Sequence, residues 1–233
     1  MLRGALIGAG NIARNGHLPA YLADETLRRR LGIVAAADLC AENLAAVRSL
    51  LPGVRAYTSP EALLAAETPD FVDICTPPFA HRPLIELALA AGCHVLCEKP
   101  VTTDLTEALA IRELVAAHQR VFFPCHQYRY APQWRAVCDA VRAAAVGPIH
   151  TGVVTVLRTG ANPGNPVWRP TWRTEQRLAG GGIIVDHGTH LFYQLHGLFG
   201  PPRELACRTE QRLAGYGVED TATLVLGYDW GMI

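Results

Sequence analysis

Short apolar runs alternate with amphipathic segments through the first half of the chain. The amphipathic segments have helical periodicity, as in the spacing of Leu44, Val47 and Leu51, and Gly92 follows one of them as a helix stop. Continuous apolar strands separated by helices predict a parallel sheet that helices cover on both faces. We therefore expect residues 1–123 to form a doubly wound α/β domain of the Rossmann type. The six expected strands are 4–8, 32–38, 54–57, 71–76, 94–99 and 120–125.

Two of the expected helices have clear N-terminal signals. Ser59 is a good N-cap and is followed by Pro60 at the first helical position. Thr103 or Asp104 is the expected cap of the long amphipathic stretch after the fifth strand. These signals mark where the chain turns from a loop into a helix.

The pattern changes after Pro124, where a helix over about 132–145 precedes segments with no helices between them. We expect residues 124–233 to form a second domain of the α+β type with a mostly antiparallel sheet. A turn signal at 229–231 leads us to interpret 232–233 as the start of a further strand, and the second domain as incomplete. The other strands expected here are 149–159, 203–211 and 218–228.

The composition excludes several classes of protein. Half of the 233 residues are apolar, which allows a sizeable core. Lys and Arg together number 21, as do Asp and Glu, and no basic stripe or basic amphipathic helix indicates a nucleic acid or a membrane surface as partner. A glycine-rich turn comes directly after the first residues, so we expect no signal peptide. The seven cysteines form no CxxC pair, so we expect a reduced, cytoplasmic setting.

The glycine-rich turn, GAGNIA at residues 8–13, matches G-x-G-x-x-A between an expected strand and an expected helix. Gly8 permits the tight turn, and Gly10 lets the backbone approach a pyrophosphate. The helix N-terminus at Asn11 and Ile12 then faces the phosphates with its N–H groups. An ordinary glycine turn is the alternative for this motif taken alone.

Asp38 ends the second expected strand, where an acidic residue binds the adenosine ribose diol of a dinucleotide. A solvated carboxylate at a strand end is the alternative. Leu39 and Cys40 come next in place of a basic residue, so a 2′-phosphate would meet uncompensated negative charge. We therefore expect NAD rather than NADP as the cofactor.

Residues 180–190, GGGIIVDHGTH, combine three glycines that are unfavourable in a helix with a polar pair in an apolar stretch. Asp186 and His190 lie at i and i+4 on one helix face, where a carboxylate orients an imidazole. A structural hydrogen bond is the alternative to a catalytic pair. Adding His187 and His196 does not complete a convincing ligand set, so we expect no metal.

Two further motifs come after expected strands, TPPFAH at 76–81 and CEKP at 97–100. Together with GAGNIA and GGGIIVDHGTH they resemble the glucose–fructose oxidoreductase, inositol dehydrogenase and MocA (Gfo/Idh/MocA) family along essentially the whole chain. The resemblance implies a Rossmann domain that binds NAD or NADP and a second α/β domain that presents its helix to the nicotinamide. It also implies Lys99, Asp186 and His190 as the catalytic set and a cis proline at Pro100.

The chemistry of these residues agrees with that resemblance. Lys99, at the carboxyl end of its strand, is expected to polarise the substrate oxygen and stabilise alkoxide character. His190 is the expected base for the hydroxyl proton that leaves when a hydride is removed from a carbinol carbon. The glycines at 180–182 would then let a helix N-terminus approach the nicotinamide and the substrate closely.

Other residues are expected to bind the cofactor or the substrate. His81 either lines the cofactor pocket or caps the helix that it begins, and His187 either touches substrate or serves packing. The loop with Trp168, Trp172 and Arg173 either walls a pocket suited to a polyol or sugar acid or is an ordinary packed loop. The expected cofactor-binding residues are Gly8, Gly10, Asn11, Ile12, Asp38, Thr76, Pro77, His81, Glu98, Lys99 and Gln127, and the expected substrate-binding residues are Arg129, Trp172, Arg173 and His187.

We therefore expect an NAD(P)-dependent oxidoreductase that transfers a hydride between the nicotinamide and a secondary alcohol or ketone of a sugar, cyclitol or sugar acid. The alternatives are a non-catalytic dinucleotide-binding regulator and an inactive, truncated homologue. The resemblance implies a homo-oligomer through the second sheet, if that sheet is complete. The octapeptide RTEQRLAG occurs at both 173–180 and 208–215, and nothing in the sequence explains the duplication.

Overall fold

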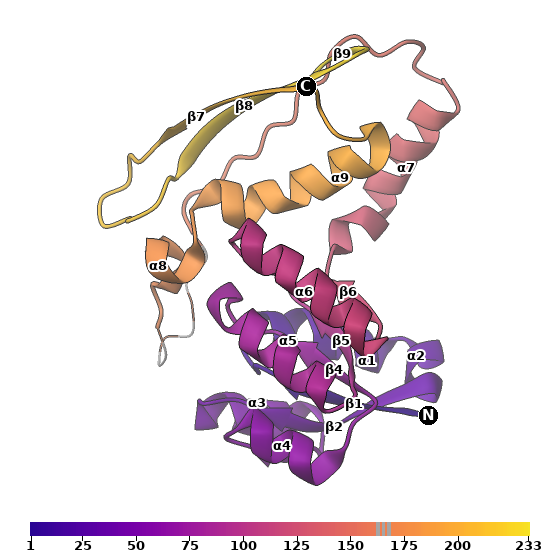
Figure 1. The fold of residues 1–233 in the computed structure, drawn as a ribbon, viewed down its shortest axis with the longest axis vertical. Coiled ribbons are helices and arrows are strands. Elements are labelled where there is room, and N and C mark those ends of the chain that lie inside the picture. The colour runs from indigo at the N-terminus through magenta and orange to yellow at the C-terminus, as the bar shows by residue number, and fades with distance from the viewer. Residues whose placement is uncertain (162–163, 165, 167–168) are drawn as a thin grey trace. The chain divides into compact units, whose positions relative to one another are not determined.

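The computed structural model describes residues 1–161, 164, 166 and 169–233. The chain divides into two compact units, Met1–Cys125 with Pro163–Trp172 and His126–Asn162 with Arg173–Ile233 (Figure 1). Each unit has its own sheet, and the candidate functional residues are shared between the two units.

The first unit is built on a six-stranded parallel sheet with the strand order β3-β2-β1-β4-β5-β6. All six expected strands are present in the order of a doubly wound fold, so the predicted Rossmann architecture is confirmed. The direction of winding reverses between β1 and β4, and such folds bind ligands beyond the carboxyl ends of the strands at this switch point. The strands are β1 Leu2–Ile7, β2 Leu31–Ala37, β3 Arg55–Tyr57, β4 Phe71–Ile74, β5 His94–Cys97 and β6 Phe122–Pro124.

Helices cover both faces of this sheet, and successive residues of β1 therefore belong to different cores. Ile7 packs in one core with Ile85, whereas Leu6 packs in the other with Leu18 and Val47. Burial on both faces is the reason that the strands are continuously apolar. The helices are α1 Leu18–Ala23, preceded by the π-helical turn η1 Ala13–His17, then α2 Glu25–Arg30, α3 Ala41–Leu50, α4 Pro60–Glu67, the 3-10 turn η2 Pro78–Ala80, α5 His81–Ala90 and α6 Leu105–His118.

Both predicted helix N-termini are confirmed. The Ser59 hydroxyl accepts the backbone N–H of Ala62 at 3.2 Å at the start of α4. Of the two candidates for the cap of α6, the structure selects Asp104, whose carboxylate accepts the N–H of Glu107 at 2.9 Å. These side chains satisfy backbone donors that have no partner within the helix.

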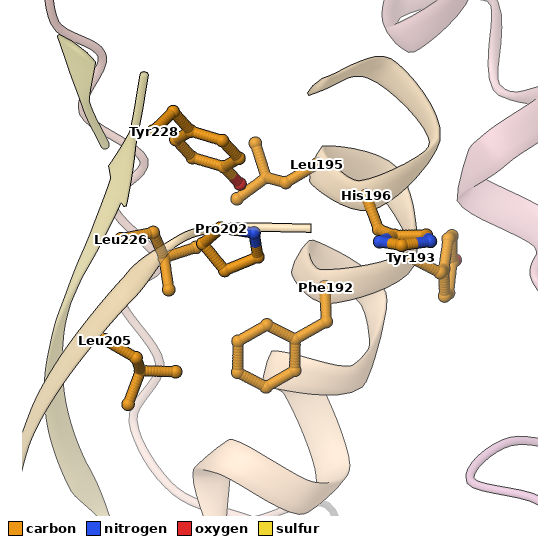
Figure 2. A pocket seen from close by; sticks show the side chains of 8 residues that line it. All are labelled: Phe192, Tyr193, Leu195, His196, Pro202, Leu205, Leu226 and Tyr228. Carbon is orange, nitrogen blue, oxygen red and sulfur yellow. The ribbon is translucent and has the colours of Figure 1, made fainter. Parts of the chain in front are cut away.

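The second unit has a three-stranded antiparallel sheet in the order β7-β8-β9, as predicted for an α+β domain. Helix α9 lies along this sheet, and its Phe192 and Leu195 face Leu205 and Leu226 across an apolar space of about 330 Å³ (Figure 2). The strands are β7 Glu204–Glu210, β8 Thr221–Tyr228 and β9 Gly231–Met232. The helical elements after Cys125 are η3 Gln127–Tyr130, α7 Pro132–Arg142, η4 Trp172–Thr174, α8 Gln176–Ala179, the π-helical turn η5 Ile184–Gly188 and α9 Thr189–Phe199.

The strand expected at 149–159 is wrong. Only Thr151 forms a bridge, with Met232, and the side chains of Val153 and Leu157 are 85% and 89% exposed. A strand needs a neighbour that completes its hydrogen-bond ladder, and among the described residues this segment pairs with β9 alone. The strand expected at 232–233 is confirmed, since Ile233 and Leu226 exchange both backbone hydrogen bonds. No helix in the described part of the chain has the length and apolar character to cross a membrane.

Candidate active site

The glycine turn lies at the switch point of the first sheet, directly after β1. Gly8 has a φ of +89°, and a Cβ on it would lie 2.8 Å from the Thr76 Cγ2 atom, so only glycine fits. Its N–H donates to the Ala37 carbonyl at 2.8 Å, which anchors the turn to the end of β2. A Cβ on Gly10, by contrast, would have no atom within 4 Å, so the chain leaves open space there.

These features fit the pyrophosphate of a dinucleotide. Asn11 and Ile12 open the helix, and the first N–H groups of a helix have no intrahelical partner. Ala13 is fully buried, which allows the close helix packing that the motif requires. The Thr76 hydroxyl oxygen is buried with no hydrogen-bond partner among the described residues, next to Gly8. A bound phosphate or ribose would satisfy such a group.

Asp38 binds the glycine turn in this structure. Its Oδ2 accepts the Ala9 N–H at 2.6 Å and its Oδ1 accepts the Cys40 N–H at 2.7 Å, while the Asn43 amide lies 3.2 Å from both oxygens. An ionised carboxylate has about four acceptor sites, and these contacts occupy them. Asp38 thus shapes the turn, and its expected bond to a ribose diol stays a prediction.

Lys99 lies just beyond the carboxyl end of β5, and the Lys99–Pro100 peptide bond is cis, as the resemblance implied. The backbone N–H of Lys99 donates to the Glu98 Oε2 atom at 3.0 Å. Lys99 is therefore held at the same edge of the sheet as the glycine turn, where the family resemblance places it.

His81 supports this edge without facing solvent. Its side chain is fully buried, its Nε2 atom lies 2.7 Å from the Thr76 carbonyl, and its Nδ1 atom lies 3.0 Å from the Pro100 carbonyl. The ring does not cap α5, whose N-cap is Ala80, because its nitrogens join the Thr76 turn to the Pro100 loop. The expectation that His81 lines the cofactor pocket stays a prediction.

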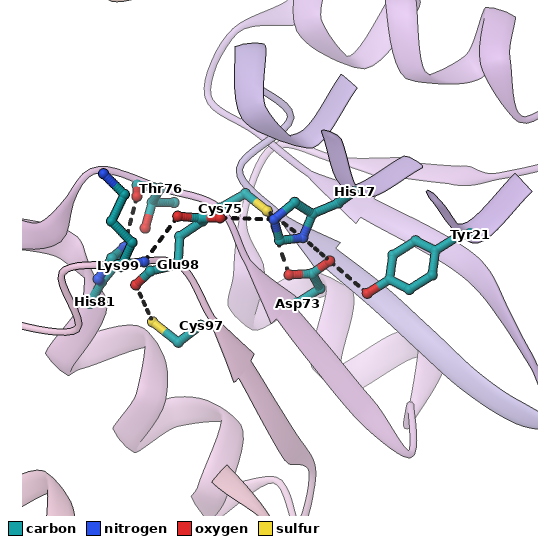
Figure 3. A network of polar contacts seen from close by, with 9 residues as sticks. All are labelled: His17, Tyr21, Asp73, Cys75, Thr76, His81, Cys97, Glu98 and Lys99. Carbon is teal, nitrogen blue, oxygen red and sulfur yellow. Dashed lines mark hydrogen bonds and ion pairs between the residues drawn. The ribbon is translucent and has the colours of Figure 1, made fainter. Parts of the chain in front are cut away.

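A buried polar network that sequence reasoning missed lies next to Lys99, on the far side of Glu98 (Figure 3). The Nδ1 atom of His17 is 2.8 Å from the Asp73 Oδ2 atom, and its Nε2 atom is 2.9 Å from the Glu98 Oε1 atom. The Tyr21 hydroxyl also donates to the Asp73 Oδ2 atom, at 2.8 Å. One signal was available, because an aspartate inside the apolar run FVDIC needs a partner when it is buried.

Among the described residues, one group has the spacing of metal ligands. Ligand atoms of His17, Asp73 and Cys125 lie within 4.8 Å of one another. Both ring nitrogens of His17 already contact carboxylates in this arrangement. We therefore describe the group as a hydrogen-bonded network.

In the second unit, His190 lies at the centre of an aromatic cluster. It is 3% exposed, its Nδ1 atom is 2.8 Å from the Tyr193 hydroxyl, and the Tyr128 ring centroid is 4.4 Å away. The Tyr193 hydroxyl also accepts the Tyr128 N–H at 3.1 Å. His187 lies at the edge of the cluster, with its ring centroid 5.5 Å from that of His190. These contacts fix the orientation of the expected base.

The other expected residues occupy scattered positions. Asp186 lies in η5, where its N–H donates to the Gly182 carbonyl at 2.9 Å. Gln127 and Arg129 lie on η3, and Arg129 lines a groove of about 320 Å³ along α7 and α9. Pro77 precedes η2. Trp172 and Arg173 belong to η4, and Trp168 is outside the described residues.

The glycines at 180–182 have a structural role inside the second unit. Gly180 ends α8 with a φ of +75°, a left-handed conformation. A Cβ on Gly181 would lie 2.5 Å from the Val185 Cγ2 atom, and one on Gly182 only 1.7 Å from the Glu219 carbonyl oxygen. Backbone conformation and packing inside the second unit therefore account for all three glycines, and their expected close approach to the nicotinamide and the substrate stays a prediction.

Residues 2–126 match the model of an oxidoreductase family with an NAD-binding Rossmann fold, and residues 134–233 match the model of the GFO/IDH/MocA C-terminal domain. The chain belongs to the Gfo/Idh/MocA family. The family resemblance read from four short motifs is thus confirmed over both units, as is the expectation of an oxidoreductase family.

Several members of this family are similar along most of the chain. A D-apiose dehydrogenase of Paraburkholderia graminis is 34% identical over 99% of this chain and 58% of its own length. A D-glucoside 3-dehydrogenase of Escherichia coli is 30% identical over 82% of this chain and 52% of its own length. The crystal structure of an oxidoreductase from Agrobacterium radiobacter with NAD⁺, L-tartaric acid and magnesium superposes with a TM-score of 0.82, at 27% identity over 99% of this chain and 64% of that one. This Gfo/Idh/MocA chain thus spans between half and two thirds of the length of these relatives.

Proposed function

We propose that this chain provides the cofactor site and the reacting groups of an NAD-dependent oxidoreductase that transfers a hydride between the nicotinamide and a secondary alcohol or ketone of a sugar, cyclitol or sugar acid. The observation that carries the proposal is the open glycine turn at the β1–β4 switch point, with Lys99 at the carboxyl end of the neighbouring β5. The sugar dehydrogenases among its relatives support the substrate class.

NAD, when bound, supplies the carbon that accepts or donates the hydride. The helix N-terminus at Asn11 and Ile12 provides N–H donors and a positive dipole end for the pyrophosphate. The buried Thr76 hydroxyl provides a further hydrogen-bonding group next to the turn. The absence of a basic residue at Leu39 and Cys40 favours NAD over NADP, because Asp38 would repel a 2′-phosphate.

Lys99 and His190 divide the acid–base work in this proposal. The Lys99 ammonium polarises the substrate oxygen and stabilises the alkoxide that precedes hydride loss. His190 takes the hydroxyl proton when an alcohol is oxidised and returns it when a ketone is reduced. The Tyr193 hydroxyl at 2.8 Å from the Nδ1 atom holds the ring of His190 in one orientation for both directions. Asp186, in the π-helical turn η5 that precedes α9, is assigned as a partner of this base.

A thermal shift of the full chain with NADH and, separately, NADPH tests the cofactor site. At about a hundred times the dissociation constant, binding adds roughly 2.7 kcal/mol to the free energy of unfolding and raises the melting temperature. We expect this rise with NADH and a smaller one with NADPH. No rise with either dinucleotide would contradict the proposal.

Turnover then tests the chemistry, with NADH formation followed by its absorbance across a panel of polyols, aldoses and sugar acids. Lys99→Met and His190→Asn are each expected to lower kcat by at least about 100-fold while leaving NADH binding in place. His118→Gln, an exposed histidine on α6, is the matched control with unchanged kcat. A thermal shift without turnover of any substrate would favour the non-catalytic regulator instead.

A further inference from the structure

The His17 ring joins two carboxylates that come from different strands. Asp73 is fully buried in β4, and Glu98, 6% exposed, comes directly after β5 (Figure 3). An ionised carboxylate only accepts hydrogen bonds, so each ring nitrogen that faces one has to donate. An imidazole ring that donates from both nitrogens is an imidazolium. With both carboxylates ionised, this geometry requires a charged His17 between Asp73 and Glu98, an arrangement that we name the charged bridge.

Three neutral groups lie near the charged bridge. Burial raises the pKa of the Tyr21 hydroxyl and of the Cys75 and Cys125 thiols, so all three stay neutral. The Cys75 sulfur lies 3.5 Å from the His17 Nδ1 atom. Although burial opposes a charge on the His17 ring, its hydrogen bonds to the two carboxylates raise the pKa of His17 to about 10. The ring is therefore protonated at neutral pH.

The charged bridge is connected directly to the backbone of Lys99. The two oxygens of Glu98 have separate tasks, since Oε1 faces His17 and Oε2 accepts the Lys99 N–H at 3.0 Å. The Glu98 N–H in turn donates to the Ile74 carbonyl of β4 at 2.9 Å. The orientation of the Glu98 carboxylate, and with it the start of the Lys99 loop, thus depends on His17.

The charged bridge also reaches the cofactor helix. His17 is the last residue of the π-helical turn η1, in which the Leu18 N–H bonds to the Ala13 carbonyl five residues earlier. The extra residue of a π turn rotates the next helical residues by about 100° relative to a continuous α-helix, because successive α-helical residues are about that far apart. In this way η1 brings His17 to the sheet edge, on the same helix as Asn11 and Ile12.

We propose that His17 is a positioning residue for Lys99: its ring bridges Asp73 and Glu98 and thereby holds the Lys99 backbone at the carboxyl edge of the sheet. Because His17 belongs to the helix that follows the glycine turn, the same bridge fixes the position of Lys99 relative to that helix. The inference rests on the proposed function in so far as Lys99 acts on the substrate oxygen. His17 itself touches neither cofactor nor substrate in this assignment. Its role is to fix the place from which Lys99 extends.

The test uses His17→Gln in the full chain, with His118→Gln as the matched control. Lys99 is the single lysine of the sequence, so reductive methylation with ¹³C-formaldehyde labels its amine and the N-terminus alone. We expect the Lys99 dimethylamine signal to shift or broaden in His17→Gln and to stay in place in His118→Gln. On unlabelled enzyme, we expect kcat to fall about 10- to 100-fold and the KM for NAD⁺ to change only a few-fold, as misplacement of a reacting group predicts.

An unchanged Lys99 signal together with an unchanged kcat would overturn the proposal. If His17→Gln does not fold, Glu98→Gln replaces it, because an amide of the same shape removes the negative charge and one of the two acceptor oxygens that join His17 to the Lys99 N–H, and is expected to shift the same signal. If the wild-type chain turns over no substrate, the proposed function fails. In that case the Lys99 signal in the variant still decides whether His17 positions the loop.

Discussion

The two glycine-rich segments of this chain use their glycines in opposite ways. In the first unit, a Cβ on Gly10 would have no atom within 4 Å, so the turn leaves room for a ligand. In the second unit, a Cβ on Gly182 would lie 1.7 Å from the Glu219 carbonyl oxygen, so the chain itself fills the space. A run of glycines therefore predicts a close approach but does not identify the group that approaches.

Both segments nevertheless lead into a π-helical turn. Turn η1 follows the first segment, and η5 follows the glycines at 180–182 and precedes α9. Each turn contains or precedes a histidine whose neighbours are polar, His17 beside two carboxylates and His190 beside the Tyr193 hydroxyl. Such turns are rare and are often found at functional sites. In each unit a π-helical turn thus positions a histidine, and the polar groups around the two histidines differ.

The largest effect is expected from Gly182→Ala. The new methyl group cannot avoid the Glu219 backbone, and we expect it to lower the free energy of unfolding by about 3 kcal/mol or more. Gly197→Ala is the matched control in α9, where a Cβ meets nothing within 4 Å, and it should stabilise the helix by roughly 1 kcal/mol. Urea denaturation measures both, and equal stabilities would refute the packing explanation.

A second effect concerns the pH dependence of the stability that His17 contributes. The pKa of His17 is raised to about 10 from 6.5, so its stabilising contribution is complete below pH 6.5 and is lost as pH rises through 10. At about 1.4 kcal/mol per pKa unit, the loss amounts to a few kcal/mol at most. Denaturation of the wild type at several pH values in this window should show the decline, and His17→Gln should remove most of it. A wild-type stability that is flat between pH 7 and 10 would contradict the charged bridge.

A smaller effect is expected at the open glycine turn. Gly10→Ala should leave the melting temperature of the chain nearly unchanged, because the methyl group points into open space. The same methyl group should weaken NADH binding by about 10-fold, or on the order of 1.4 kcal/mol, if a pyrophosphate occupies that space. Fluorescence titration with NADH measures the affinity. Gly8→Ala is the contrasting variant, in which the strained turn should lower stability as well.

The smallest effect concerns Tyr193, whose hydroxyl contacts both His190 and the Tyr128 N–H. Tyr193→Phe removes these hydrogen bonds without changing the ring, and we expect a loss of about 1 kcal/mol in the free energy of unfolding. If Tyr193 orients the proposed base, kcat should also fall when it is calculated for the folded fraction of the variant. A variant that loses stability but keeps kcat would assign Tyr193 to packing alone.

Much of the first unit could be predicted from local patterns. The six strands, the caps at Ser59 and Asp104 and the turn at Gly8 all depend on neighbouring residues in the chain. The charged bridge could not be predicted in this way, because residues 17, 73 and 98 meet only after the strand order places β1, β4 and β5 side by side. The strand expected at 149–159 failed for the related reason that a strand depends on its neighbour as well as on its own residues.

The repeated octapeptide RTEQRLAG adopts two structures in one chain. At 173–180 it spans the end of η4 and the helix α8, and at 208–215 it forms the end of β7 and a turn. Its leucine is 4% exposed in the first copy, at Leu178, and 41% exposed in the second, at Leu213. Its last residue is left-handed in both copies, with a φ of +75° at Gly180 and +82° at Gly215.

The glycine conformation is the same in both copies because it depends on the lack of a Cβ, which is a property of the sequence alone. The choice between helix and strand differs because it depends on which partner supplies hydrogen bonds and covers the leucine. The same division holds for the whole molecule. Local sequence determined the parallel sheet, the cofactor turn and the family, whereas the long-range contacts of the folded chain decided that His17 lies behind Lys99 and that the glycines at 180–182 serve packing.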